Sequence, residues 1–316
     1  MPAPRKKTLT ESSKVAHENC WAKTLRDGGP GISVRDHCLN VGCVAEALLE
    51  LLPPPLRTLL PPGAATLAAL HDIGKVSPGF QQKCDTWQPS FKRDAGYENR
   101  HYRISQILLE SLSNGRLQRW AEAVGAHHGR VQGCDRPGEL GGKPWQQAQL
   151  NLLKALETEF GPLPPDDAKD EATEWLLAGL ITLADWLGSD EDNFSPENRG
   201  TLDKITQRAK ADEIVKRLEL SGATLVAEKS FQQVFAERLK GNTPRPLQQE
   251  IITSLQPVPG VYIIEDVMGS GKTEAALWLA YRLMAAGHAR GLYFGLPTRV
   301  TSDRIHRRIR EFLAQV

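Results

Sequence analysis

Apolar residues recur at helical spacing through the first two thirds of the chain, and this periodicity constrains the fold most. Segment 33–52, SVRDHCLNVGCVAEALLELL, has this spacing, opens with a Ser/Asp capping pattern and is followed by three prolines. Strand-like alternation is nearly absent in this part of the chain. Further helices are predicted at 64–73 (closed by Gly74), 102–112, 117–126, 144–159 and 170–187. We therefore expect residues 1–225 to form an all-α domain.

The pattern changes after about residue 225. Residues 260–287, GVYIIEDVMGSGKTEAALWLAYRLMAAG, predict a short strand at 261–264, a glycine-rich loop and an amphipathic helix. A second strand, GLYFGLP, and a helix at 299–316 follow. This order is typical of the beginning of a parallel α/β sheet. Because two strands cannot close a core, we expect residues 226–316 to be the incomplete start of a larger α/β domain.

Composition excludes several classes of protein. The net charge is +1, from 39 basic and 38 acidic residues, so any contact with nucleic acid must come from local basic groups. The five cysteines are scattered without a Cys-x-x-Cys pair, which argues against a disulfide framework or zinc knuckle and favours a reducing cytoplasm. The sequence shows no signal-peptide core and no apolar run of membrane-spanning length. We expect a cytoplasmic protein that has no membrane partner.

A histidine and an aspartate stand side by side in AALHDIGKVSPGF, as His71 and Asp72. Adjacent helix residues point roughly 100° apart, so such a pair can reach two ions a few ångströms apart, with the carboxylate bridging them. A second adjacent pair, His127 and His128, occurs in GAHHGR. The sequence therefore predicts a site for two metal ions within the helical domain.

Imidazoles and carboxylates without a thiolate form a donor set that suits Mn, Fe, Co, Ni or Zn better than Mg or Ca. Two such ions activate a bridging water and neutralise a phosphate, which predicts hydrolysis of phosphodiesters or phosphomonoesters. Each residue alone also has a structural interpretation. His37 could bond a helix carbonyl, the His-His pair could be a polar helix end, and Lys75 could be a solvated lysine favoured by the helix dipole. The candidate ligands, in chain order, are His37, His71, Asp72, His101, His127, His128 and Asp185.

This order of histidines and aspartates resembles the HD phosphohydrolase superfamily. The blocks WAKT, RDHCLNVG, HDIGKVSPGFQQK, HYRIS, GAHHG and LADWLGSD resemble the nuclease domain of the type I CRISPR-associated nuclease-helicases. The resemblance implies two divalent transition-metal ions (Mn, Fe, Co or Ni), with Asp72 shared between them and Lys75 steadying a phosphate. It implies one ion on His37, His71, Asp72 and Asp185, and a second on Asp72, His101, His127 and His128.

The segment MGSGKTE, residues 268–274, predicts a loop that binds the phosphates of a nucleoside triphosphate. Its amides and the following helix would cradle the phosphates, Lys272 would reach the outer ones, and Thr273 would hold Mg²⁺. Asp266 replaces a glycine of the strict motif, a departure that resembles superfamily 2 helicases; the structural alternative is a glycine-rich turn. TPRPLQQE resembles the adenine-reading segment of those helicases. The candidate nucleotide-binding residues are Gln248, Gly269, Ser270, Gly271, Lys272 and Thr273.

The resemblance therefore implies an HD-type helical domain at 1–225 and the start of a RecA-like helicase lobe at 226–316. No Asp-Glu box and no second lobe follow the loop, so we expect no ATPase or helicase activity from this chain alone, although the intact helicase would use ATP and Mg²⁺. The leading hypothesis is a nuclease of single-stranded DNA, endo- or exonucleolytic, that an RNA-guided CRISPR surveillance complex recruits. Two alternatives stay open: an HD phosphohydrolase acting on nucleotides, and a catalytically idle recruitment module.

Overall fold

A computed structural model describes residues 15–87, 93–129, 137–197, 202–218, 229–295 and 299–316 of the chain. The chain divides into two compact units, Met1–Leu220 and Ser221–Val316, and each is described by itself. No helix in the described ranges combines the length and the apolar character that crossing a membrane requires.

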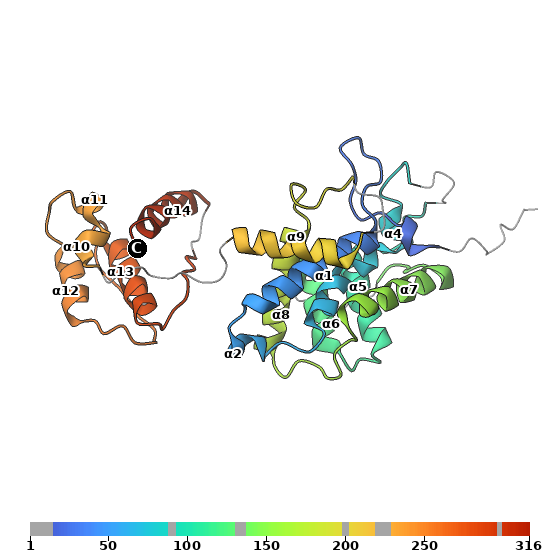
Figure 1. The fold of residues 1–316 in the computed structure, drawn as a ribbon, viewed down its shortest axis with the longest axis horizontal. Helices are drawn as coiled ribbons and strands as arrows, with labels where there is room; N and C mark the ends of the chain where they lie inside the picture. Colours follow the sequence, from blue (N-terminus) through green and yellow to red (C-terminus); the bar gives the residue numbers. More distant parts are fainter. Residues whose placement is uncertain (1–14, 88–92, 130–136, 198–201, 219–228, 296–298) are drawn as a thin grey trace, which may run out of the picture. The chain divides into compact units, whose positions relative to one another are not determined.

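The first unit is helical, as the sequence predicts (Figure 1). Its helices and 3₁₀ turns are η1 (His17–Asn19), α1 (Val34–Leu51), α2 (Pro54–Arg57), α3 (Ala64–Ala69), η2 (Leu70–Lys75), α4 (Pro78–Gln81), α5 (His101–Leu112), α6 (Gln118–Gly125), η3 (Ala126–His128), α7 (Lys143–Phe160), α8 (Glu171–Gly188) and α9 (Lys204–Arg217). The predicted helices match α1, α5, α6, α7 and α8 closely, whereas α9 was not predicted.

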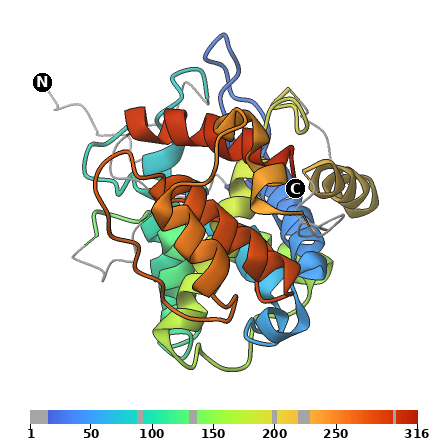
Figure 2. The same ribbon diagram turned by 90° about the vertical axis from the view of Figure 1, so that its left-hand side faces the viewer.

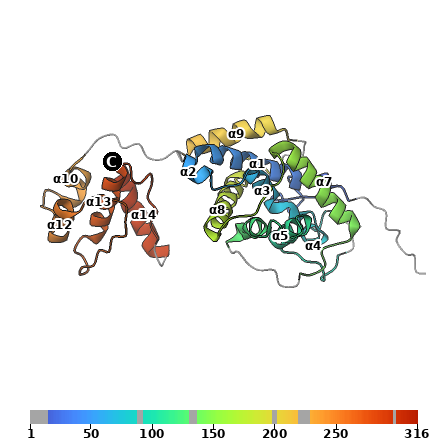
Figure 3. The ribbon, with the colours of Figure 1, turned by 90° about the horizontal axis from the view of Figure 1, so that it is seen from below.

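Helix α1 lies at the centre of this unit, packed against α3, α8 and α9 (Figure 3). It begins where the capping pattern predicts, because the Ser33 side chain accepts a hydrogen bond of 3.1 Å from the Asp36 amide. Helix α8 has the same kind of cap, with Asp170 Oδ1 accepting from the Thr173 amide at 2.8 Å. Apolar residues of α1 and α8 share one core cluster, so these two helices form a fixed frame for whatever they carry on their polar faces.

The segment predicted as one helix at 64–73 is split in the structure. Helix α3 ends at Ala69, and a tighter 3₁₀ turn, η2, continues to Lys75. Gly74 therefore lies inside this turn and does not end the helix, so that part of the prediction was wrong. A Cβ atom at Gly74 would lie 2.0 Å from the His101 carbonyl oxygen and 2.8 Å from the Ser105 amide nitrogen. The glycine is needed because the backbone of α5 approaches η2 closely.

Replacing Gly74 by alanine tests this close approach. We expect Gly74→Ala to lower the free energy of unfolding by about 1–3 kcal/mol or more, because the clash is with backbone atoms that cannot rotate away. Gly179→Ala, in the middle of α8 where a Cβ meets nothing within 4 Å, should raise it by about 0.5–1 kcal/mol. Urea denaturation of both variants measures the difference, and equal effects would contradict the account.

The second unit is drawn in orange to red in Figure 2. Its helices are α10 (Phe231–Val234), α11 (Ala236–Leu239), α12 (Pro246–Ser254), α13 (Lys272–Ala285) and α14 (Arg299–Leu313). Phe231 packs on Trp278 of α13 with ring centroids 5.5 Å apart, and Tyr281 is fully buried. The predicted helices after the glycine loop and at the end of the chain are thus confirmed, around a small core of their own.

The two strands expected in this unit are not formed in the described part. Residues 261–267 and 291–295 have no regular secondary structure, while 296 and 297 lie outside the described residues. The side chains of Val261 and Tyr293 are each 94% exposed. A strand requires a neighbour for its backbone N–H and C=O groups, and these segments do not pair with one another or with another described strand.

Candidate metal centre

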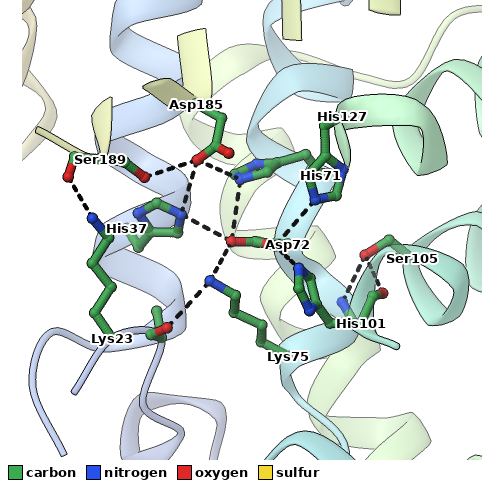
Figure 4. A network of polar contacts seen from close by, with 12 residues as sticks. Lys23, His37, His71, Asp72, Lys75, His101, Ser105, His127, Asp185 and Ser189 are labelled. Atoms are coloured by element: carbon green, nitrogen blue, oxygen red, sulfur yellow. Dashed lines mark hydrogen bonds and ion pairs between the residues drawn. The ribbon is translucent and has the colours of Figure 1, made fainter. Parts of the chain in front are cut away.

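Five elements of the first unit bring the predicted ligands together in two neighbouring groups, and Figure 4 labels all of these ligands except His128. Helix α1 carries His37, η2 carries His71 and Asp72, α5 begins with His101, η3 carries His127 and His128, and α8 carries Asp185 near its end. Since these elements pack against one another through the unit's core, residues far apart in sequence become neighbours.

The first group of donors consists of His37, His71, Asp72 and Asp185, whose potential ligand atoms lie within 4.8 Å of one another. The Nε2 atoms of His37 and His71 lie 2.9 and 3.2 Å from Oδ2 of Asp72. The same two nitrogens lie 3.6 and 3.3 Å from Oδ1 of Asp185. Two imidazoles and two carboxylates thus converge on a single point, as a divalent ion requires.

The second group consists of His101, His127 and His128, also within 4.8 Å of one another. The other oxygen of Asp72, Oδ1, faces this group, 3.1 Å from His101 Nε2 and 3.6 Å from His127 Nε2. His101 and His128 approach to 3.0 Å between their Nε2 atoms. The two oxygens of Asp72 therefore face different groups, which is the placement a bridging carboxylate needs.

The buried imidazoles of His71 and His127 are held with one nitrogen facing the centre. His71 Nδ1 donates to the Ala68 carbonyl at 2.9 Å, and His127 Nδ1 donates to the Val124 carbonyl at 2.8 Å. These bonds turn each Nε2 towards the centre, and the Nε2 of His127 is buried there without a hydrogen-bond partner among the described residues. Buried polar atoms left in this way fit ligands of a metal ion.

Burial sets the protonation of most imidazoles here. It lowers the pKa of His37 to about 4 and that of His127 to about 3, so both are neutral donors near neutral pH. His71 differs: burial opposes its charge, but the Asp72 and Asp185 carboxylates raise its pKa to about 10. The two carboxylates thus favour a positive charge at this point, and a bound divalent cation would neutralise them in the same way.

Asp72 is ionised and fixed in place. Burial opposes its charge, but His71, Lys75 and His101 hold its pKa well below the usual range. Lys75, which is buried, places Nζ 2.6 Å from Asp72 Oδ2 and donates to the Ala22 carbonyl at 3.2 Å. The lysine predicted to steady a phosphate therefore lies at the centre, and its role in binding or catalysis stays a prediction.

The sequence analysis did not predict the residues that support this centre through hydrogen bonds. Gln81 accepts from the Trp21 amide at 3.1 Å and donates to the Trp21 carbonyl at 2.9 Å and the Lys75 carbonyl at 2.8 Å. Lys23 and Ser189, at the edge of the centre, were also missed. All of these lie in or next to the motif blocks, yet no local spacing reveals contacts between residues so distant in sequence.

Glu98 anchors the chain just before α5, and so fixes where His101 begins that helix. Its carboxylate accepts from Arg100 Nε at 2.9 Å, Arg100 Nη2 at 2.8 Å, and the amides of Asn99 and Gly138 at 3.1 and 3.2 Å. The hydrogen bonds from Arg100 are the main cause that lowers the pKa of Glu98 from 4.5 to about 2. The ionised carboxylate therefore stabilises the folded unit.

The pH dependence of stability tests this anchor. Since the folded pKa of Glu98 lies below the unfolded value, its contribution is complete above about pH 4.5 and is lost as the pH falls towards 2. Glu98→Gln should lower the free energy of unfolding at pH 7 by about 1–3 kcal/mol, and the deficit should shrink in that acid range. Urea denaturation across pH measures it, with Glu213→Gln, on the exposed face of α9, as control. A deficit independent of pH would contradict the account.

The second unit brings most of its predicted nucleotide-binding residues together. Gly271 is the N-cap of α13 with φ 93°, so Lys272 and Thr273 lie in the first turn of that helix. Lys272 Nζ donates to the carbonyls of Asp266 and Val267 at 2.6 and 2.7 Å, which curls the loop around it. Gln248 is buried and its Nε2 donates to the Gly271 carbonyl at 3.4 Å.

Gly269 has φ 85° in the same loop, a left-handed conformation that favours glycine. Ser270 Oγ, next to it, is buried with no hydrogen-bond partner among the described residues. Gln248 also accepts from the Arg245 amide at 3.0 Å, so its amide is occupied in this structure. The nucleotide-binding roles of these residues stay predictions.

The donor set and the helical scaffold define an HD-type domain, and comparison with known proteins agrees. Residues 21–194 match the family described as "Cas3, HD domain". A "CRISPR-associated endonuclease/helicase Cas3" of Thermus thermophilus is 31% identical, covering 94% of this chain and 36% of that protein. The protein of the same name from Escherichia coli is 34% identical, covering 74% of this chain and 32% of that protein. The chain belongs to the Cas3 HD-domain family.

Solved structures give the same picture. The structure titled "Crystal structure of T. fusca Cas3-ATP" is 28% identical with a TM-score of 0.62, covering 94% of this chain and 37% of that one. Another, titled "CRISPR RNA-guided surveillance complex, pre-nicking", is 28% identical with a TM-score of 0.58, covering 93% of this chain and 38% of that one. The chain spans about a third of the length of the curated relatives it matches.

The placement of Asp72 predicts different metal stoichiometries for two variants. Asp72→Asn should weaken the binding of both ions, because each loses a charged oxygen ligand. Asp185→Asn should weaken the binding of only one ion. We expect losses greater than the 10–100-fold typical of removing a supporting partner. Titration calorimetry of metal-stripped protein with Mn²⁺ measures both, with His288→Gln in the second unit as control. Identical binding curves for the two aspartate variants would contradict a shared Asp72.

Proposed function

We propose that this chain is a metal-dependent nuclease that cleaves single-stranded DNA in CRISPR defence, with two divalent transition-metal ions at the centre around Asp72. The observation that carries the proposal is the division of Asp72's oxygens between two groups of donors. A pair of ions held in this way lowers the pKa of a bound water and stabilises the entering and leaving oxygens of an in-line displacement.

The protein's own residues would hold and orient the reacting groups. The imidazoles of His71 and His127, fixed through Nδ1, keep Nε2 towards the centre, and the buried Asp72 supplies an oxygen to each side. Lys75 Nζ lies against Asp72 and would turn to a substrate phosphate, as a short movement of its long side chain allows. Asp72 and Lys75 are thus the proposed catalytic residues.

Two observations favour single-stranded DNA over free nucleotides as substrate. The relatives carry the names endonuclease/helicase and nuclease/helicase, and a nuclease cleaves a nucleic-acid polymer. Trp186, directly after Asp185, is 69% exposed, and exposed aromatic rings stack the bases of single strands without reading sequence. An RNA-guided surveillance complex as partner is supported by the similar structure titled for one, in which guide pairing would supply sequence specificity.

We further propose that the second unit begins an ATP-dependent helicase lobe whose loop at 269–273 binds ATP with Mg²⁺. The left-handed glycines and the placement of Lys272 at the start of α13 support this role. We place the protein in the cytoplasm, because the described cysteines Cys20, Cys38, Cys43 and Cys84 are free and buried.

Metal-stripped protein with circular single-stranded DNA tests the nuclease. We expect nicking when Mn²⁺, Co²⁺ or Ni²⁺ is restored, little with Mg²⁺, and at least a 100-fold slower rate in Asp72→Ala, because both ions lose a ligand. His288→Gln should cleave at the wild-type rate. Gel analysis of the nicked circle measures the rate.

Two other outcomes would contradict the proposal. Phosphate or nucleoside released from deoxynucleoside triphosphates, without nicking, would indicate a nucleotide phosphohydrolase. Stoichiometric metal binding with neither activity would indicate an idle recruitment module.

A further inference from the structure

We propose that Ser189 and Lys23 are positioning residues that hold Asp185 in the metal centre. The inference rests on the proposed metal site, not on the identity of the substrate. Asp185 differs from Asp72 in needing such support: its side chain is 21% exposed, against 3% for Asp72, and it reaches the centre from the edge (Figure 4). A carboxylate open to water keeps several orientations unless a neighbour fixes it.

Ser189 provides the first contact. Its Oγ donates to Asp185 Oδ1 at 2.9 Å, and this is the oxygen that faces His37 and His71. The two residues are four apart, so the hydroxyl lies over the same face of the last turn of α8. Ser189 is also the C-cap of α8, where the chain leaves the helix. Its position therefore depends on what holds the end of α8 in place.

Lys23 provides that hold, since its Nζ donates to the Ser189 carbonyl oxygen (Figure 4). Lys23 belongs to segment 21–33, which two isolated bridges close, Trp21 with Ser33 and Thr24 with Pro30. The Lys23 carbonyl accepts from the Gly31 amide at 2.8 Å across this segment. The Lys23 side chain thus extends from a backbone that hydrogen bonds hold in place to the end of α8.

The same segment also contacts the side chain of Lys75, next to Asp72. The carbonyl of Ala22, next to Lys23, accepts from Lys75 Nζ at 3.2 Å, and Lys75 lies 2.6 Å from Asp72. Adjacent residues of one segment are therefore connected to Asp72 through Lys75 and to Asp185 through Ser189. We infer that the segment sets the separation between the two carboxylates that share the first ion.

Two simpler interpretations make different predictions. If Lys23 only capped the carbonyl end of α8, its loss would lower the free energy of unfolding and leave the metal affinity of the folded protein unchanged. If Lys23 acted only as a nearby positive charge, removing it would strengthen the binding of a cation. The positioning role alone predicts weaker metal binding with the fold retained.

Equilibrium dialysis of metal-stripped protein against Co²⁺, with the Co²⁺ absorption spectrum recorded, tests the role of Ser189. We expect Ser189→Ala to weaken one of the two ions by about 10–100-fold and to alter its spectrum, while the other ion binds as in the wild type. Ser189→Thr, which keeps the hydroxyl, should restore the affinity. Thr182→Ala is the matched control, because Thr182 Oγ1 donates only to the Ala178 carbonyl of the same helix, at 2.8 Å.

Lys23→Met should weaken the binding of the same ion. Lys23→Arg, which keeps the positive charge and the donor, should bind this ion more tightly than Lys23→Met does. Wild-type affinity in Ser189→Ala, or unchanged or tighter binding in Lys23→Met, overturns the proposal, as does an equal loss for both ions. The assay contains no DNA, so a protein that binds metal as predicted but does not cleave would contradict only the proposed function.

Discussion

The charge of the buried Asp72 carboxylate is the constraint on which the rest of the metal centre depends. An ionised group so deep in the fold is costly unless positive charge or metal surrounds it. Here His71, Lys75 and His101 hold its pKa well below the usual range. Elements η2 and α5 bring compensating groups to its two oxygens, Lys75 to Oδ2 and His101 to Oδ1.

The scaffold achieves this through close backbone packing. Gly74 lets α5 approach η2 until the His101 carbonyl would collide with any side chain there, and this brings His101 within 3.1 Å of Asp72. The frame of α1 and α8 presents His37 and Asp185 from the other side. Because interiors are close-packed, small changes at such contacts shift ligands that lie several residues away.

Four candidate ligands, His71, Asp72, His127 and His128, could be singled out from the sequence because their pattern is local: an adjacent His and Asp and an adjacent His and His. The other candidates were added by the resemblance to a family, because no local pattern shows which distant residues approach these pairs. The Ser33 cap and the bounds of α1 and α8 followed from similarly local rules. The hold of Lys23 on Ser189 and the anchor at Glu98 could not be predicted, since each joins segments whose approach depends on the whole packing. The two predicted strands failed for a related reason, because a strand is defined by a partner that periodicity cannot show.

The most direct test of the central claim is a crystal structure of the Mn²⁺-loaded protein with anomalous scattering recorded at the manganese edge. We predict two anomalous peaks about 3.5–4 Å apart, with one oxygen of Asp72 directed to each or one shared between them. A single peak, or two peaks of which only one contacts Asp72, would contradict the account.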